Sequence, residues 1–181
     1  MGNSNHKNKA LFLDRDGVIN KAMPRKVYLT RPEQFEFMPE IIPVAQRAKE
    51  LGYKVIVVTN QGQINRGELT HKGLAEIHAR MHSLMPGLID VVYYCPHTAD
   101  EDCECRKPKP GMLLKAAAEH NIDLSKSIML GDGDNDILAG QAAGCKTIFI
   151  TNEHRGQEVN GLNPDFVVSD LLDIVQLLEN E

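Results

Sequence analysis

The sequence predicts an α/β fold, a Rossmann-like three-layer sandwich with a mainly parallel central sheet. Two observations predict it: short β-branched runs alternate with segments of helical periodicity, and these runs are almost continuously hydrophobic. Such alternation is typical of strands joined by crossover helices, and continuous hydrophobicity is what strands covered on both faces require. No internal repeat, low-complexity tract or linker interrupts the pattern, so residues 1–181 are expected to form a single domain.

Six runs are expected to form the strands. They are rich in Val, Ile, Leu and Phe, residue types that suit a covered sheet. Several end on polar residues, which indicates that the chain leaves the core there. The runs are 10–14 (ALFLD), 54–60 (KVIVVTN), 90–95 (DVVYYC), 127–132 (SIMLGD), 146–151 (KTIFIT) and the shorter 165–168 (DFVV).

Five segments are expected to form the helices. In the first, Val44, Ala48 and Leu51 fall on one stripe, and Gly52 provides a C-terminal stop. Thr70 is a suitable N-cap for the second helix, whose apolar residues recur at helical spacing. The five segments are 40–51, 71–84, 110–120, 134–143 and 170–179.

Composition and charge narrow the function classes. The chain is 42% hydrophobic and 25% charged, as is ordinary for a globular protein. No apolar stretch approaches the roughly 18 residues of a membrane span, and residues 1–10 lack the apolar segment of a signal peptide. We therefore expect a cytoplasmic protein without membrane contact. The net charge of −5 disfavours nucleic acid as a partner. Nothing in the sequence sets the oligomeric state, and a monomer is compatible with it.

Polar residues follow the apolar runs where ligands of open α/β sheets bind, outside the carboxyl ends of the strands. Asp14 and Asp16 end the first run on the same side of an extended segment. Two such carboxylates repel each other unless a cation or a proton lies between them. A site for Mg²⁺, which prefers oxygen ligands, is one interpretation. A solvated turn is the other, because "DRDG" is turn-like.

Further strand ends favour the metal site. Asp132, Asp134 and Asp136 follow the 127–132 run, and although one of them can cap the next helix, three acids in five residues indicate that at least one faces the same cation. Whether Asp134 or Asp136 touches the metal directly is left open. Thr59 ends the second run, where its hydroxyl suits a phosphate oxygen, unless it is only a β-branched strand residue.

A basic pair completes the set. Arg106 and Lys107, in "CRKPKPGM", precede a helix start at Pro110. There the lysine can act as a point charge on a phosphate and the arginine as a bidentate clamp, although surface basic residues are usually only solvated. Acids, a hydroxyl and a lysine together favour phosphoryl transfer, in which a carboxylate nucleophile attacks phosphorus. No P-loop or nicotinamide fingerprint is present in the sequence.

These motifs resemble those of the haloacid dehalogenase (HAD) superfamily of aspartate-nucleophile phosphatases. The resemblance covers residues 11 to about 150 and includes "DRDGVIN", "TNQ", "CPH…CECRKPKPGM" and "GDGDND". It is to the small capless branch that holds D,D-heptose 1,7-bisphosphate phosphatases and histidinol-phosphate phosphatases. The superfamily motifs D-x-D, a strand-end Ser/Thr, Lys and G-D-x-x-x-D are matched in order by Asp14 and Asp16, Thr59, Lys107, and Asp132 and Asp136.

The resemblance implies the roles of these residues. Asp14 would attack phosphorus, and Asp16 would protonate the leaving oxygen and then activate water. Asp14, the backbone carbonyl of Asp16, and Asp132 would hold Mg²⁺, with Asp136 supporting the metal site from behind. The implied substrate-binding residues are Arg15, Asn20, Thr59, Asn60, Gln61, Arg66, Arg106 and Lys107.

The loops set the substrate expectation. No insertion is large enough for a cap domain, so the loops 20–38, 61–70 and 95–107 are expected to roof the site. We expect a small phosphorylated metabolite, preferably heptose bisphosphate. Histidinol phosphate is the enzymatic alternative, and a phosphate-binding module without catalysis is the alternative from another class. A distal phosphate is expected to meet Arg25, Lys26 and Arg66, unless these are only scattered surface charge; "TNQGQINRG" departs from the heptose-type "NQSGIARG" at Gly62, Gln63 and Asn65.

A second metal site is expected in the "CPHTADEDCEC" loop. Its Cys95, His97, Cys103 and Cys105 are the four ligands that a closed structural zinc site needs. Free buried thiols and a disulfide are the alternatives, and a reducing cytoplasm disfavours the second. We expect zinc to fix the neighbouring phosphate-site residues and to take no part in the chemistry.

Two further groups are expected to have structural roles. Cys145 is expected to be a small core residue. His78 and His82 lie four residues apart on the 71–84 helix without the Glu of a zincin motif, and a polar helix face is expected there.

Overall fold

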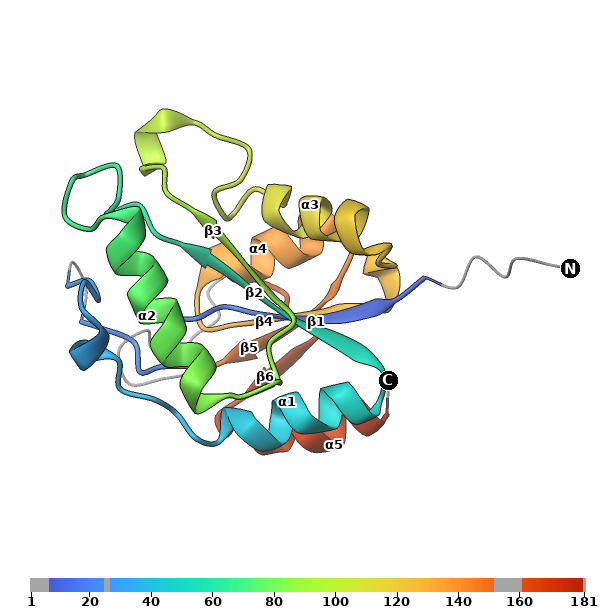
Figure 1. The fold of residues 1–181 in the computed structure, drawn as a ribbon. Helices are drawn as coiled ribbons and strands as arrows, with labels where there is room; N and C mark the ends of the chain where they lie inside the picture. The colour runs from blue at the N-terminus through green and yellow to red at the C-terminus, as the bar shows by residue number, and fades with distance from the viewer. Residues whose placement is uncertain (1–6, 25–26, 152–160, 181) are drawn as a thin grey trace, which may run out of the picture.

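The computed structural model describes residues 7–24, 27–151 and 161–180. Six strands form one sheet in the order β3-β2-β1-β4-β5-β6, and every neighbouring pair is parallel. Figure 1 shows the strands running side by side through the middle of the molecule. The strands are β1 (Lys9–Leu13), β2 (Tyr53–Asn60), β3 (Val91–Cys95), β4 (Ile128–Gly131), β5 (Lys146–Ile150) and β6 (Phe166–Val168).

Helices cover both faces of this sheet, which confirms the predicted α/β three-layer class (Figure 1). Three short 3₁₀ helices, η1 (Pro32–Gln34), η2 (Ala99–Glu101) and η3 (Leu124–Lys126), lie in the connections. The α-helices are α1 (Ile41–Glu50), α2 (His71–Leu84), α3 (Gly111–His120), α4 (Asp134–Ala143) and α5 (Asp173–Glu179).

Two hydrophobic layers hold the sandwich together. Leu11 and Leu13 of β1 pack on one side of the sheet, in the cluster that holds the buried faces of α1, α2 and α5. Ala10 and Phe12 pack on the other side, with the buried faces of α3 and α4. Successive residues of a strand point to opposite faces, so a strand covered on both sides must be apolar throughout. This is why the sequence shows unbroken hydrophobic runs.

The predicted elements agree with the observed ones to within a few residues. Asp14 and Asp132 follow the last residues of β1 and β4. The last helix begins at Asp173 and not at residue 170, because Asp170 accepts a hydrogen bond from the backbone of Leu172 and forms a turn there. The 3₁₀ helices were not predicted, since such short turns have no periodic signal.

The strand order determines where the polar strand ends meet. β1 and β4 are central neighbours, and β2 lies on the other side of β1. The chain runs outward from β1 to β2 and β3, then crosses back to β4, which makes this edge a topological switch point where ligands bind. Among the residues that the structure describes, no helix is both long and apolar enough to cross a membrane.

Candidate active site

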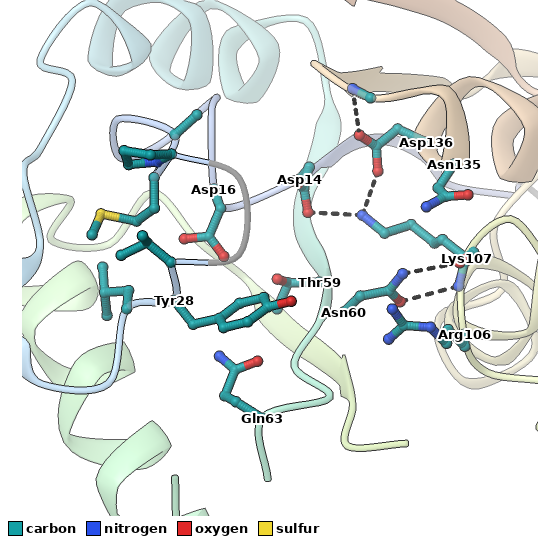
Figure 2. Close-up of a pocket in the computed structure, with 16 residues that line it drawn as sticks. Asp14, Asp16, Tyr28, Thr59, Asn60, Gln63, Arg106, Lys107, Asn135 and Asp136 are labelled. Carbon is teal, nitrogen blue, oxygen red and sulfur yellow. Dashed lines mark hydrogen bonds and ion pairs between the residues drawn. The ribbon is translucent and has the colours of Figure 1, made fainter. Parts of the chain in front are cut away.

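The carboxyl ends of β1, β2 and β4 surround a cavity of about 330 Å³. Figure 2 shows Asp14 and Asp16 on one side of it and Lys107 reaching in from the other. Thr59 lies between them, at the end of β2. Segments far apart in the sequence thus converge here, as the motifs predicted.

Lys107 is the central cation of the cavity, although it is almost completely buried. Its Nζ donates to Asp14 Oδ1 at 2.7 Å, to Asp136 Oδ1 at 2.5 Å and to the carbonyl of Val58 at 2.7 Å. Asn60 fixes the main chain that carries it, because the Asn60 amide donates to the Lys107 carbonyl at 2.9 Å and accepts from the Lys107 N–H at 3.1 Å. Asn60 therefore joins the end of β2 to the lysine loop.

Burial and neighbouring charges set the protonation states of Lys107 and Asp14. Burial lowers the pKa of Lys107, but the carboxylates of Asp136 and Asp14 outweigh it and raise the pKa, so the lysine stays charged. Burial raises the pKa of Asp14 to about 6, against the opposing effect of Lys107, and nearby Asp136 adds to the rise. Further positive charge beside Asp14 would stabilise the carboxylate form that a nucleophile needs.

Three buried acids form a candidate cation site. One carboxylate oxygen from each of Asp14, Asp132 and Asp136 lies within 4.8 Å of the others. Asp136 also accepts from the Gly133 N–H at 3.0 Å through Oδ2. Three acids and a single lysine leave an excess of negative charge in a buried place, which suits a hard divalent cation with oxygen ligands. The exposed Asp134, on the first turn of α4, is not part of this group.

Gly17 lets the turn after Asp16 approach the third acid. A Cβ atom at this position would overlap the carboxylate of Asp132. Its φ of 101° lies in the region that side chains rarely adopt. Asp14 is itself buried, so the "DRDG" segment is a turn closed over the cation site and not a solvated one.

Asp16 is held by three side chains that were expected to bind the substrate. Arg15 Nη2 donates to both of its oxygens, at 2.9 and 2.7 Å, and Asn20 and Gln61 donate at 3.0 and 3.2 Å. Burial raises the pKa of Asp16, but the charge of Arg15 and these hydrogen bonds together have the larger, opposite effect. The pKa is therefore lowered overall, and the carboxylate is ionised. Arg15, Asn20 and Gln61 are fully buried and do not line the cavity. A buried charge needs donors, and here these three side chains supply them from behind Asp16.

His78 differs from the expected polar helix face. It is half-buried on α2, and its Nε2 lies 3.4 Å from Arg15 Nη1. Burial lowers the pKa of His78 to about 3, and the Arg15 charge adds to the effect, so the ring is neutral and can accept this contact. His82 is exposed, as expected.

Comparison with known proteins agrees with this geometry. Residues 104–174 match the family model described as HAD-hydrolase-like. A D-glycero-beta-D-manno-heptose-1,7-bisphosphate 7-phosphatase of Helicobacter pylori is 46% identical over 77% of this chain and 81% of its own length. The chain belongs to the HAD-like hydrolases.

Two further relatives of the chain are also heptose bisphosphate phosphatases. The D-glycero-alpha-D-manno-heptose-1,7-bisphosphate 7-phosphatase of Campylobacter jejuni is 41% identical over 82% of this chain and 86% of its own length. A crystal structure of the D,D-heptose 1,7-bisphosphate phosphatase from B. bronchiseptica, complexed with magnesium and phosphate, superposes with a TM-score of 0.85. It is 32% identical and covers 96% of this chain and 99% of its own. Relatives of this HAD-like hydrolase thus include phosphatases named for both anomers.

Three cavity residues of this HAD-like hydrolase were missed or only noted as departures. Tyr28 lines the cavity, and its ring centre lies 4.3 Å from the Arg66 guanidinium. Gln63 lines it as well and is 3% exposed. Asn135 lies at its rim on α4 (Figure 2). Both Tyr28 and Gln63 lie in loops that were expected to roof the site. A polar Gln63 two residues after the strand-end "TNQ" was the available signal, whereas nothing in the sequence marks the Tyr28 side chain itself.

The basic residues expected around the substrate divide into two groups. Arg106 lines the cavity. Arg66 does not; its Nε donates to Glu68 at 3.0 Å while its guanidinium stacks on Tyr28. Arg25 and Lys26 lie outside the described residues.

The cysteine loop of this HAD-like hydrolase forms a compact cluster next to the cavity. The sulfur atoms of Cys95, Cys103 and Cys105 lie 3.2 to 3.5 Å apart, and His97 Nδ1 lies 3.3 Å from the sulfur of Cys105. These S–S distances are far longer than a disulfide bond, and all four ligand atoms lie within 4.8 Å of one another. The carbonyl of His97 accepts from Arg106 Nη1 at 3.0 Å, which links the cluster to a cavity residue.

Proposed function

We propose that this chain is a Mg²⁺-dependent phosphatase that hydrolyses the 7-phosphate of D-glycero-D-manno-heptose 1,7-bisphosphate through an aspartyl-phosphate intermediate. The observation that carries the proposal is the buried Asp14 carboxylate, hydrogen-bonded to Lys107 at the bottom of a cavity at the switch point of the sheet. Its heptose-bisphosphate relatives, with identities of 46% and 41%, support the substrate.

In the first step, an Asp14 oxygen attacks phosphorus, and the bond from phosphorus to the sugar oxygen breaks. Asp16 is ionised in the free protein and takes up a proton from solvent as the negative phosphate binds and raises its pKa. It then gives this proton to the leaving oxygen. Lys107 offsets the negative charge of the phosphoryl oxygens, and Thr59 donates to one of them. The product is a phosphorylated Asp14 and a free sugar hydroxyl.

In the second step, water attacks phosphorus and Asp16 accepts its proton. The bond between Asp14 and phosphorus breaks, which releases inorganic phosphate and restores the enzyme. The hydrogen bonds that Arg15, Asn20 and Gln61 donate to Asp16 favour its ionised form, the state that this step requires. Arg15, Asn20 and Gln61 act here as positioning residues and not as substrate ligands.

The donor set fits the proposed magnesium ion. Asp14, Asp132 and the backbone carbonyl of Asp16 would hold it, and when bound it would supply positive charge against the phosphoryl oxygens. Both oxygens of Asp136 are hydrogen-bonded, one to Lys107 and one to Gly133, which favours the supporting role predicted from the sequence. Magnesium and phosphate in the B. bronchiseptica relative support the assignment.

A substrate panel tests the function. Phosphate release is measured with both anomers of heptose 1,7-bisphosphate and with histidinol phosphate, in Mg²⁺ and in EDTA. We expect kcat/KM for heptose bisphosphate to exceed that for histidinol phosphate by about 100-fold or more, with no turnover in EDTA. A preference for histidinol phosphate would reassign the substrate, and no release from any compound would leave only the binding-module alternative.

Gly17→Ala should lower kcat/KM by about 100-fold, because the new methyl group displaces the Asp132 carboxylate from the cation site. Gly87→Ala is the matched control: Gly87 also has a positive φ of 72°, but a Cβ there meets nothing within 4 Å. Both variants carry the same type of backbone strain. Steady-state phosphate release, together with thermal melting, separates the two effects, and equal activity in both variants would contradict the proposed role of Gly17.

Zinc in the cysteine cluster is proposed on the same donor argument, with four ligands and no open position. Cys105→Ser should release the zinc and lower the affinity for substrate, because the His97 carbonyl that holds Arg106 moves with the cluster. Cys145→Ser serves as control, since that buried thiol is not part of the cluster. Elemental analysis of both purified variants is the measurement; a wild-type protein that is fully active without zinc would refute the proposal.

A further inference from the structure

Thr59, near the end of β2, and Gln61 and Gln63, in the loop that follows, form a hydrogen-bonded relay whose direction is fixed by its chemistry. Gln61 Nε2 donates to Asp16 Oδ2 at 3.2 Å and to Thr59 Oγ1 at 2.7 Å. Arg15 can only donate, so the Asp16 oxygen that it contacts is an acceptor. The Gln61 group that faces the same oxygen must then be the donor, the amide nitrogen. The Gln61 oxygen therefore points the other way, toward Gln63.

The same logic fixes the next amide. Gln63 Nε2 donates to Gln61 Oε1 at 2.6 Å, so the nitrogen of Gln63 is committed to the relay. Its backbone carbonyl accepts from the N–H groups of Glu68 and Leu69, at 2.9 and 3.2 Å, which anchors the residue in the loop. Among the described residues, none donates a hydrogen bond to Gln63 Oε1. The side chain therefore has one uncommitted polar atom, and it is an acceptor.

The residue that carries this acceptor is part of the cavity wall. Gln63 is 3% exposed and lines the same cavity as Asp14 and Lys107. In Figure 2 its amide points toward the ring of Tyr28, on the Thr59 side of the cavity. A fixed carbonyl oxygen attracts O–H and N–H donors and repels phosphate oxygens. The wall at Gln63 thus suits a hydroxyl-bearing part of a ligand and not an anionic one.

We propose that Gln63 is a specificity-determining residue whose Oε1 accepts a hydrogen bond from a hydroxyl of the substrate's carbon skeleton. The inference rests on the proposed phosphatase function and deepens it, since it assigns a polyhydroxylated substrate to the cavity. Sites that hydrogen-bond a substrate hydroxyl discriminate strongly against analogues that lack it, because their buried polar group is then left unpaired.

The second half of the relay has a separate effect. Because Thr59 Oγ1 accepts from Gln61, its own proton is available to a phosphoryl oxygen. The donor end of Gln63 holds Gln61 in this orientation and acts equally on every phosphate ester. The acceptor end acts only on substrates that carry a hydroxyl. Two substitutions at one position separate these contributions.

Gln63→Met keeps the length of the side chain and removes both ends, whereas Gln63→Glu keeps an acceptor and removes the donor. The measured quantity is the ratio of kcat/KM for heptose 1,7-bisphosphate to kcat/KM for para-nitrophenyl phosphate, which has no hydroxyl. In Gln63→Met we expect this ratio to fall about tenfold, as for one lost hydrogen bond. Gln63→Glu is measured at high ionic strength, which screens its added negative charge from the second phosphate of the bisphosphate. There we expect both rates to fall and the ratio to stay within about twofold of wild type.

An unchanged ratio in Gln63→Met, with the wild type active on both compounds, would overturn this inference alone. A fall of the ratio in both variants would also overturn it, because the retained acceptor would then have no effect. A wild-type protein that releases phosphate from neither compound would overturn the proposed function and this inference with it. Circular dichroism and melting of each variant confirm that the compared proteins are folded.

Discussion

Asp14→Asn should abolish phosphate release, with kcat lower by about 10⁴-fold or more. The amide has the shape of the carboxylate but is no nucleophile, so the aspartyl phosphate cannot form. The fold should persist, because Oδ1 of the asparagine can still accept from Lys107. Single-turnover phosphate release and circular dichroism are the measurements.

Asp134→Asn is the control for this variant. It makes the same chemical change at an acid of the "GDGDND" segment that is exposed and outside the cation group. We expect it to retain near wild-type activity. Near-normal turnover in Asp14→Asn would instead reassign the nucleophile, and comparable losses in both variants would indicate a general effect of lost negative charge.

Lys107→Met should be the second severe variant, in both activity and stability. The substitution leaves the buried carboxylates of Asp14 and Asp136 without their cation. Removing one partner of a buried ion pair costs about 3–5 kcal/mol, and loss of the charge on the phosphoryl group should lower kcat by about 10³-fold. Denaturant unfolding and phosphate release, each with and without Mg²⁺, measure the two effects.

The matched variants test whether charge is the cause. Adding Asp14→Asn to Lys107→Met removes one of the stranded carboxylates, so the double variant should be more stable than Lys107→Met alone. Lys109→Met removes a lysine from the same loop, but its partners Asp102 and Glu104 are at the surface. Its melting temperature should match wild type. A double variant less stable than Lys107→Met would contradict the electrostatic explanation.

The polar residues at the strand ends could be predicted because the sequence shows where each buried strand ends. Asp14, Thr59 and Asp132 each come at or just after the end of a buried run, and parallel strands bring such ends to one edge. The lysine was predicted from its place in a basic pair before a helix start, and the motif resemblance then gave it a role. Its loop has no periodic signal, and it is the Asn60 side chain that holds it in place.

The direction of side chains in turns could not be predicted in the same way. Arg15, Asn20 and Gln61 share the motifs of the site, yet a turn has no fixed alternation of faces, and all three point at Asp16. His78 was expected on a polar helix face but contacts the buried Arg15. The sequence of the helix gives no sign of an arginine that another segment brings to it. Tyr28 lies in an irregular loop, where composition alone cannot tell cavity wall from surface.

The loop between β3 and α3 is closed at both ends. Gln61 N–H donates to the carbonyl of Cys95 where the loop leaves the sheet, and Asn60 holds Lys107 where it returns. Between these two contacts lie Arg106 and the cysteine and histidine side chains of the cluster. Residues 95–107 are thus held at both ends by hydrogen bonds and between them by the cysteine and histidine cluster. A new substrate preference at this face should therefore be engineered by exchanging residues 95–107 as a whole, since a partial exchange would separate Lys107 from the cluster proposed to position it.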